Sequence, residues 1–288
     1  MPELPEVETV RRTLMQLVVN KTIKDVKVGW PNMVKEPDDV KQFSEQLVGQ
    51  TILEIKRRGK FLLFVLTDVV LVSHLRMEGR YGLFNQNDEV AKHTHITFYF
   101  TDKTELRYAD VRKFGTMHVF EKGQEELVMP LAQLGVEPFS EEFTVEVLEK
   151  AYIESKRAIK TALLDQKTVV GLGNIYVDEA LFRARILPER TASSLTSEEM
   201  ALLFVEIKST LQEAVDAGGS SIKSYVNGQG EMGMFQQRLN VYGKKGEPCT
   251  VCGNPIEKKS SWRPRYSFLF KLPTLTLKTS TPYTNSIY

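Results

Sequence analysis

The chain opens with Met1-Pro2-Glu3-Leu4-Pro5-Glu6-Val7-Glu8-Thr9, and this stretch is the most informative one for the fold and its chemistry. From Glu6 to Val19 apolar residues recur at three- and four-residue intervals, which predicts a helix with one buried face. Removal of the initiator methionine would leave Pro2 with a free secondary amine. α-Amino groups titrate near pH ~8, well below lysine, so a useful fraction of such an amine is unprotonated at neutral pH. The sequence thus places a candidate nucleophile just before a helix.

A secondary amine that attacks a sugar C1′ forms an iminium ion, which is cationic without an added proton. This ion acidifies the C2′ proton and permits elimination of the 3′ phosphate. Glu3 beside the amine could deliver and remove protons, and Glu6 could orient the amine or favour the helix N-terminus. Proline and glutamate are also common at helix N-termini, and the residues taken alone favour that purely structural interpretation.

The bulk composition fits a globular chain. It has 288 residues, of which 42% are hydrophobic and 26% are charged. No apolar run is as long as a membrane span and the acidic N-terminus does not resemble a secretory signal, so we expect a cytoplasmic protein. A net charge of +1 does not suggest a nucleic-acid partner, and a solvated face is the commoner interpretation of each local basic cluster. These clusters are Lys56, Arg57, Arg58 and Lys60; Arg112 and Lys113; and Lys156, Arg157 and Lys160.

Two patterns divide the chain. Residues 1–130 carry short β-rich segments between turns, which predicts a sandwich or barrel with the first helix packed beside it. The expected strands are Ile23–Val28, Ile52–Leu66, Val70–Leu83, His95–Phe100, Glu105–Tyr108 and Met117–Phe120. After a linker at 131–142, residues 143–240 show helical spacing. The expected helices are Val145–Lys156, Ala158–Leu164, Ile175–Arg183 and Ser197–Ala217.

The opening motif Pro-Glu-Leu-Pro-Glu-Val-Glu-Thr resembles the signature of the formamidopyrimidine-DNA glycosylases, and the resemblance runs from Met1 to about Lys258. It implies an α+β fold: an N-terminal β-sandwich with flanking helices, then a helical domain with a helix–two-turn–helix motif and a zinc β-hairpin. It also implies Pro2 as the Schiff-base nucleophile, Glu3 as the general acid/base and Lys60 as a proton donor in β-elimination. Lys60 alone would otherwise be an ordinary turn lysine.

Two further motifs resemble the DNA-contacting segments of that family. His74 and Met77 lie in Ser-His-Leu-Arg-Met-Glu-Gly-Arg-Tyr, and Arg112 and Phe114 lie in Tyr-Ala-Asp-Val-Arg-Lys-Phe-Gly. The resemblance implies that Met77, Arg112 and Phe114 fill the gap left by an extruded base, for which a flexible methionine is suited. It also implies DNA contacts by His74 and His93. A core methionine and a structural histidine are the commoner interpretations of such residues in isolation.

In the helical half, Gln166–Tyr176 reads Gln-Lys-Thr-Val-Val-Gly-Leu-Gly-Asn-Ile-Tyr. Two glycines before a helix let backbone N–H groups approach a phosphate. The resemblance implies phosphate contacts by Asn174 and Lys160, which would position DNA without reading its sequence. It further implies a lesion-recognition loop at 218–236, whereas a flexible linker is the alternative. The loop residues singled out are Ser221, Tyr225, Val226 and Glu231.

The resemblance breaks at the C-terminus. The family has a zinc hairpin of the form Cys-x2-Cys-x16-Cys-x2-Cys, and here only Cys249 and Cys252 are cysteines. By this spacing Leu269 and Leu272 stand where the other two ligands belong. The resemblance also implies an arginine with a role in δ-elimination, and Pro264 stands at its position. Two thiolates do not close a tetrahedral zinc site. We therefore expect a zinc-finger remnant at 241–259, doubtful zinc binding, and a tail at 260–288 unlike the family.

The combined expectation is a monomeric, nucleoid-associated base excision repair enzyme. It would remove 8-oxoguanine and formamidopyrimidines from duplex DNA and cleave the abasic site by β/δ-elimination, with activity impaired by the altered C-terminus. One alternative is a non-catalytic damaged-DNA binder from a disrupted gene. Another is excision of oxidised pyrimidines as in the endonuclease VIII branch, but that branch usually has glycine where Leu4 stands, and the Met77, Arg112 and Phe114 set also argues against it.

A frameshift would explain the altered tail. Synonymous codons for Ser260–Pro273, read one nucleotide out of frame, can encode Val-Val-Gly-Ala-Arg-Gly-Thr-His-Phe-Cys-Ser-Asn-Cys-Gln, with cysteines at the positions of Leu269 and Leu272. Glu257-Lys258-Lys259 could be encoded by a run of adenines in which one is easily gained. We predict that the gene carries this run and, one frame over, the cysteine codons. Sequencing the gene checks both, and the absence of either contradicts the hypothesis.

Overall fold

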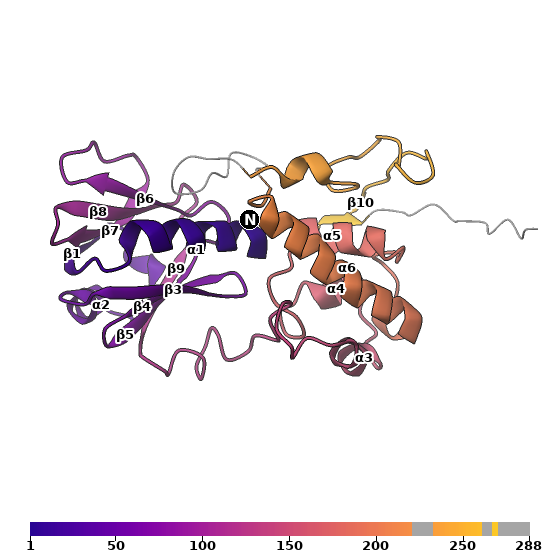
Figure 1. Cartoon of the computed structure of the whole chain (residues 1–288), viewed down its shortest axis with the longest axis horizontal. Coiled ribbons are helices and arrows are strands. Elements are labelled where there is room, and N and C mark those ends of the chain that lie inside the picture. Colours follow the sequence, from indigo (N-terminus) through magenta and orange to yellow (C-terminus); the bar gives the residue numbers. More distant parts are fainter. Residues whose placement is uncertain (221–232, 261–266, 270–288) are drawn as a thin grey trace, which may run out of the picture.

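The structure is a computed structural model that describes residues 1–220, 233–260 and 267–269. A β-rich N-terminal half and a helical C-terminal half lie side by side, and the first helix starts between them (Figure 1). No helix in these ranges is long and apolar enough to cross a membrane. The expected α+β fold, a sandwich followed by a helical region, is confirmed.

The N-terminal half contains two sheets around a shared apolar core. The four-stranded sheet has the order β1 (Ile23–Val28), β7 (Thr94–Phe100), β8 (Thr104–Ala109), β6 (Arg80–Asn85). The five-stranded sheet has the order β2 (Val34–Glu36), β9 (Thr116–Glu121), β5 (Val69–His74), β4 (Phe61–Leu66), β3 (Ile52–Arg58). Side chains from both sheets, including Phe64 and Phe98, are almost fully buried in one cluster, which makes the arrangement a sandwich.

Two of the expected long strands are each two strands, so these predictions were wrong in length; the first pair forms a hairpin and the second pair lies in different sheets. The segment 52–66 folds back at Gly59, whose φ of +55° lies in the left-handed region that favours glycine, and β3 then pairs with β4. The segment 70–83 is interrupted at 75–79, where Arg76 has a φ of +54°. A run of residues that favour β-strands does not reveal such turns, because the residues on either side of the turn are also apolar.

α1 (Leu4–Val18) begins two residues earlier than its apolar spacing predicts. Pro5 occupies the first turn, where a missing N–H costs nothing, and the Glu6 carboxylate accepts the backbone N–H of Glu3 at 2.8 Å. Val7 and Leu14 bury the apolar face of α1 against the sandwich. α2 (Val40–Leu47) was not predicted at all, although Asp39 caps it by accepting the N–H of Gln42 at 2.7 Å.

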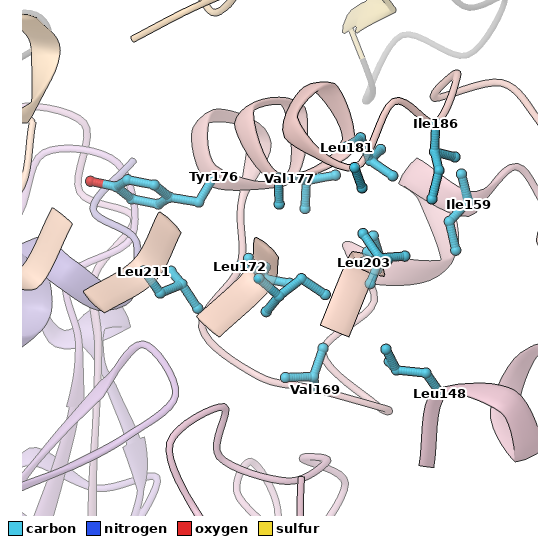
Figure 2. Close-up of a cluster of buried hydrophobic side chains, with 14 of the residues drawn as sticks. Leu148, Ile159, Val169, Leu172, Tyr176, Val177, Leu181, Ile186, Leu203 and Leu211 are labelled. Carbon is cyan, nitrogen blue, oxygen red and sulfur yellow. The ribbon is translucent and has the colours of Figure 1, made fainter. Parts of the chain in front are cut away.

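The helical half is built around one cluster, shown in Figure 2, to which all its α-helices contribute. These helices are α3 (Val145–Tyr152), α4 (Ile159–Leu163), α5 (Asn174–Arg183) and α6 (Ser197–Asp216). α4 and α5, with the turns between them, form the expected helix–two-turn–helix unit. Short 3₁₀ turns lie at Pro31–Met33, Ala192–Ser194 and Phe235–Arg238, and β10 (Lys259–Ser260) pairs with β11 (Ser267–Leu269).

The segment between the two halves is fastened to the β3–β4 turn by Glu137. Its carboxylate accepts the N–H of Gly59 at 2.6 Å and pairs with Arg57 at 2.8 Å and Arg58 at 3.3 Å. Arg58 also donates to the carbonyl oxygens of Leu134 and Gly135. These two arginines are therefore neither a solvated face nor a phosphate site. They join the halves of the molecule.

Candidate active site

The carboxylate of Glu3 lies at the N-terminus of α5. It accepts backbone N–H groups from Gly173 at 2.7 Å, Ile175 at 2.9 Å and Tyr176 at 3.3 Å. The first N–H groups of a helix have no partner inside it, and the helix dipole favours a negative charge there. A Cβ on Gly173 would lie 2.5 Å from Oε1 of Glu3, so glycine is required for this approach. Of the two glycines that the sequence offered as a phosphate cradle, Gly173 thus binds a carboxylate of the same chain, and the N–H of Gly171 donates to the side-chain oxygen of Gln166.

Glu6 lies behind Glu3 and joins three segments. Its carboxylate accepts the N–H of Glu3 at 2.8 Å, the hydroxyl of Tyr176 at 2.5 Å and the N–H of Ser220 at 2.7 Å. Tyr176 is fully buried, and Figure 2 shows its hydroxyl pointing out of the apolar cluster toward the N-terminal half. Tyr176 and Ser220 were not predicted as site residues, although Tyr176 is the last residue of the glycine-containing motif Gln166–Tyr176.

Lys60 reaches the same place from the β3–β4 turn. Only 6% of the residue is exposed, and its Nζ donates to the carbonyl oxygen of Leu172 at 2.6 Å. Burial lowers the pKa of Lys60, while the nearby charges of Glu3 and Glu6 act in the opposite direction. Lys60 is therefore not a solvated turn lysine. It is a desolvated ammonium group coupled to both carboxylates.

The pKa of Glu3 is raised from its usual value of 4.5. Burial is the main cause and the charge of Glu6 adds to it, whereas Lys60 and the backbone N–H groups of Ile175 and Tyr176 lower it. A carboxyl group whose pKa is raised holds its proton to a higher pH than an ordinary glutamate, which suits a group that both donates and accepts protons. Pro2 precedes it in sequence and is also buried. The structure thus brings together four sequence-predicted residues: Pro2, Glu3, Glu6 and Lys60.

Two exposed turns at one end of the sandwich carry the candidate wedge residues. Met77 is 38% exposed and Phe114 is 50% exposed, which contradicts the interpretation of Met77 as a core residue. The guanidinium of Arg112 lies 4.7 Å from the ring centroid of Phe114. The carboxylate of Asp110 accepts the N–H groups of Arg112, Phe114 and Gly115 at 2.9–3.0 Å. Asp110, which sequence reasoning did not single out, therefore shapes the second turn.

The two histidines expected at DNA occupy different environments. His93 is half-buried with a φ of +74°, and its carbonyl oxygen accepts the N–H of Asp110 at 3.0 Å, so it adjoins the Phe114 turn. His74 is only 6% exposed; its Nδ1 accepts the N–H of Arg76 at 2.9 Å and its ring packs edge-on against Phe61. In this conformation His74 shapes the Met77 turn from inside, and its direct DNA contact stays a prediction.

The phosphate contact of Lys160 also stays a prediction, and in this structure its ammonium group has a carboxylate partner. Lys160 is 4% exposed, and its Nζ pairs with the Asp178 carboxylate at 2.7 Å. Burial raises the pKa of Asp178 to about 7, against the opposing charge of Lys160. Asn174 is half-buried at the start of α5, where a phosphate could still approach. A lysine in a sequence does not reveal whether its partner is a phosphate or a carboxylate of the same chain.

The zinc ligands are incomplete. The Sγ atoms of Cys249 and Cys252 accept the N–H groups of Val251 and Asn254, both at 3.4 Å, and both cysteines are unbridged. Within the part of the chain that the structure describes, no three metal-binding side chains come together. The sequence from Lys258 to Tyr288 contains no cysteine, histidine, aspartate or glutamate. The residues present therefore do not fit a structural zinc ion.

Several predicted residues lie outside the described ranges. They are Leu272 and the lesion-loop residues Ser221, Tyr225, Val226 and Glu231. The residues on either side of the loop are described, and there Ser220 pairs with Met234 in an isolated antiparallel β-bridge. Only the backbone of Leu269 is described, in β11.

Family models match most of the chain. One described as the formamidopyrimidine-DNA glycosylase N-terminal domain matches residues 1–117, and one described as the formamidopyrimidine-DNA glycosylase H2TH domain matches residues 134–226. The formamidopyrimidine-DNA glycosylase of Shouchella clausii is 74% identical over 258 residues, which cover 90% of this chain and 94% of that protein. The Bacillus subtilis enzyme of the same name is 60% identical over the same shares.

Solved structures of a formamidopyrimidine-DNA glycosylase bound to DNA are also similar to this chain. Lactococcus lactis Fpg (MutM) in complex with DNA containing N7-benzyl-Fapy-dG has a TM-score of 0.87 and 41% identity, covering 94% of this chain and 98% of that one. The same enzyme with DNA containing an abasic site has a TM-score of 0.84 and 42% identity, covering 90% and 95%. With such identities over nine-tenths of its length, the chain belongs to the formamidopyrimidine-DNA glycosylase family and is a DNA glycosylase of base excision repair.

Proposed function

We propose that this chain removes oxidised purines, namely 8-oxoguanine and formamidopyrimidines, from duplex DNA and then cleaves the abasic site. The observation that carries the proposal is the buried Glu3 carboxyl, held by the N-terminus of α5 directly after Pro2 and coupled to Lys60. The Lactococcus lactis relative bound to Fapy-dG-containing DNA supports the substrate class. We further propose that it acts as a monomer in the cytoplasm, at the nucleoid.

In the proposed mechanism the unprotonated amine of Pro2 attacks C1′ of the damaged nucleotide. The C1′–N bond breaks and the C1′–O4′ bond opens, which leaves an iminium ion at C1′. The leaving base and the sugar ring oxygen each take up one proton, one supplied by protonated Glu3 and the other given up by the Pro2 nitrogen. The resulting iminium ion accepts electrons when the Glu3 carboxylate removes the C2′ proton, and the 3′ phosphate leaves. Lys60, already desolvated, would supply a proton in this elimination, and a second elimination would release the 5′ phosphate.

Borohydride trapping on duplex DNA containing 8-oxoguanine opposite cytosine tests the nucleophile. We expect a covalent adduct on the N-terminal peptide of the wild type. Pro2→Gln should retain the initiator methionine, because methionine is removed only before small residues, and should lower the adduct by about a hundredfold or more. Pro5→Ala is the matched proline control and should trap normally. Mass spectrometry showing retained methionine in a fully active wild type would contradict the mechanism.

The raised pKa of Glu3 has a consequence for stability. A carboxyl group whose pKa is higher in the folded protein than its usual 4.5 binds more protons when folded, so its contribution to stability falls as pH rises from 4.5 to the raised value. We expect the unfolding free energy of the wild type, relative to Glu3→Gln, to decrease across that interval and then level off. Urea denaturation of both proteins over a pH series measures the difference. A difference that increases with pH would show that the Glu3 pKa is lowered.

The incomplete zinc ligands favour a second candidate, a damaged-DNA binder with impaired or absent turnover. We expect purified protein to carry far less than one zinc ion per chain. Leu269→Cys/Leu272→Cys should restore zinc binding and tighten binding to lesion-containing duplex by about tenfold or more, because folding of the hairpin is coupled to the metal. Leu269→Ser/Leu272→Ser is the control and should do neither. The impairment would be refuted if the wild type carried one zinc ion per chain and bound lesion-containing duplex as tightly as Leu269→Cys/Leu272→Cys.

A further inference from the structure

The two wedge turns share a neighbour inside the sandwich, the hydroxyl group of Tyr108. The Met77 turn ends at Gly79, just before β6, and the Phe114 turn ends at Gly115, just before β9. A Cβ added to either glycine would overlap the Tyr108 hydroxyl oxygen, and it would also lie 2.7–2.8 Å from Cζ of the same ring. One phenol oxygen is therefore wedged between the backbones of both turns.

Space, and not backbone conformation, requires glycine at these two positions. Neither Gly79 nor Gly115 has a positive φ, so other residues could adopt their backbone angles. At Gly79 a Cβ would additionally lie 2.7 Å from the carbonyl oxygen of Leu75. Each turn therefore has a glycine at its contact with Tyr108 because a larger residue would overlap the tyrosine ring or hydroxyl.

Tyr108 lies in the four-stranded sheet and packs against a tyrosine that is hydrogen-bonded to the other sheet. It is 1% exposed on β8, which lies between β6 and β7, and its neighbour across the β6 pairing is Tyr81. The rings of Tyr81 and Tyr108 lie 5.0 Å apart, and the Tyr81 hydroxyl donates to Oγ of Ser73 in the opposite sheet at 2.7 Å. The Tyr108 hydroxyl therefore has a fixed position with respect to the strands from which both turns emerge.

We propose that the Tyr108 hydroxyl is a spacer that sets the separation of the Met77 and Phe114 turns, which makes Tyr108 a positioning residue for base extrusion. Met77 on one turn and Arg112 and Phe114 on the other must enter the duplex together, and a misplacement of about 1 Å can cost about a hundredfold in rate. The proposal deepens the proposed function, because it relies on these three residues contacting DNA. It does not rely on the chemistry at Pro2.

The test compares Tyr108→Phe, Gly115→Ala and the double variant by their affinity for duplex DNA containing a tetrahydrofuran abasic analogue, relative to undamaged duplex. We expect Gly115→Ala to lose about tenfold or more of this preference, and Tyr108→Phe to lose about threefold or more through a gap between the turns. In the Tyr108→Phe background the alanine should cost at least about threefold less, because the atom it overlaps most is gone. Gly29→Ala, with no atom nearer than 3.4 Å to its Cβ, is the matched control and should be neutral in both backgrounds.

The spacer role would be overturned if Gly115→Ala cost the same preference for abasic-analogue duplex in both backgrounds. It would also be overturned if Tyr108→Phe left that preference unchanged. Thermal unfolding separates loss of the fold from loss of positioning, because Phe keeps the buried ring and Tm should change little. Borohydride trapping on single-stranded abasic DNA should be equal in the wild type and all these variants, since no duplex has to be wedged open there. Failure of trapping in the wild type would contradict the proposed function while leaving the binding comparison for Tyr108 intact.

Discussion

The position of Glu3 at the N-terminus of α5 is the interaction on which the other features of the site depend. A buried carboxylate is costly unless its oxygens are hydrogen-bonded, and here three backbone N–H groups of another domain supply the donors. The same contact joins the two halves, because Leu4, the next residue, belongs to the apolar core of the helical half. The first turn of α1 therefore connects the two halves of the molecule, and the same turn carries the candidate catalytic residues.

This joint constrains its surroundings. Gly171 and Gly173 must lack side chains because Leu4 and Glu3 occupy the space. Lys60 is brought in by the β3–β4 turn, which Glu137 of the connecting segment holds in place. The geometry of the site therefore depends on how the two halves are fastened as much as on its own residues. The desolvation that follows raises the pKa of Glu3 and lowers that of Lys60, which shifts both toward neutrality where proton transfer is efficient.

The sequence predicted the regular elements well because apolar spacing is a local property, and α5 and β1 lie within one residue of expectation. It was less successful where the outcome depends on distant partners. The DNA contacts of His74 and Lys160 stay predictions, but the sequence did not indicate the partners that both side chains have within the chain, the backbone N–H of Arg76 and the carboxylate of Asp178. Asp110, Tyr176 and Tyr108 were missed for the same reason: their roles arise from contacts between elements that only folding brings together.

The C-terminal remnant shows how a domain can lose its metal ligands without losing its attachment. The Glu179 carboxylate, fully buried on α5, accepts the N–H groups of Asn240, Val241 and Tyr242 at 2.8–3.0 Å. Cys249 packs with Val241 and Ile256 in a small apolar cluster. These contacts involve no metal, so the path of the chain up to Ile256 is fixed by α5, the same helix that holds Glu3. The attachment of residues 240–256 to α5 therefore does not depend on a complete set of zinc ligands, and neither does the position of the Glu3 carboxyl on the same helix.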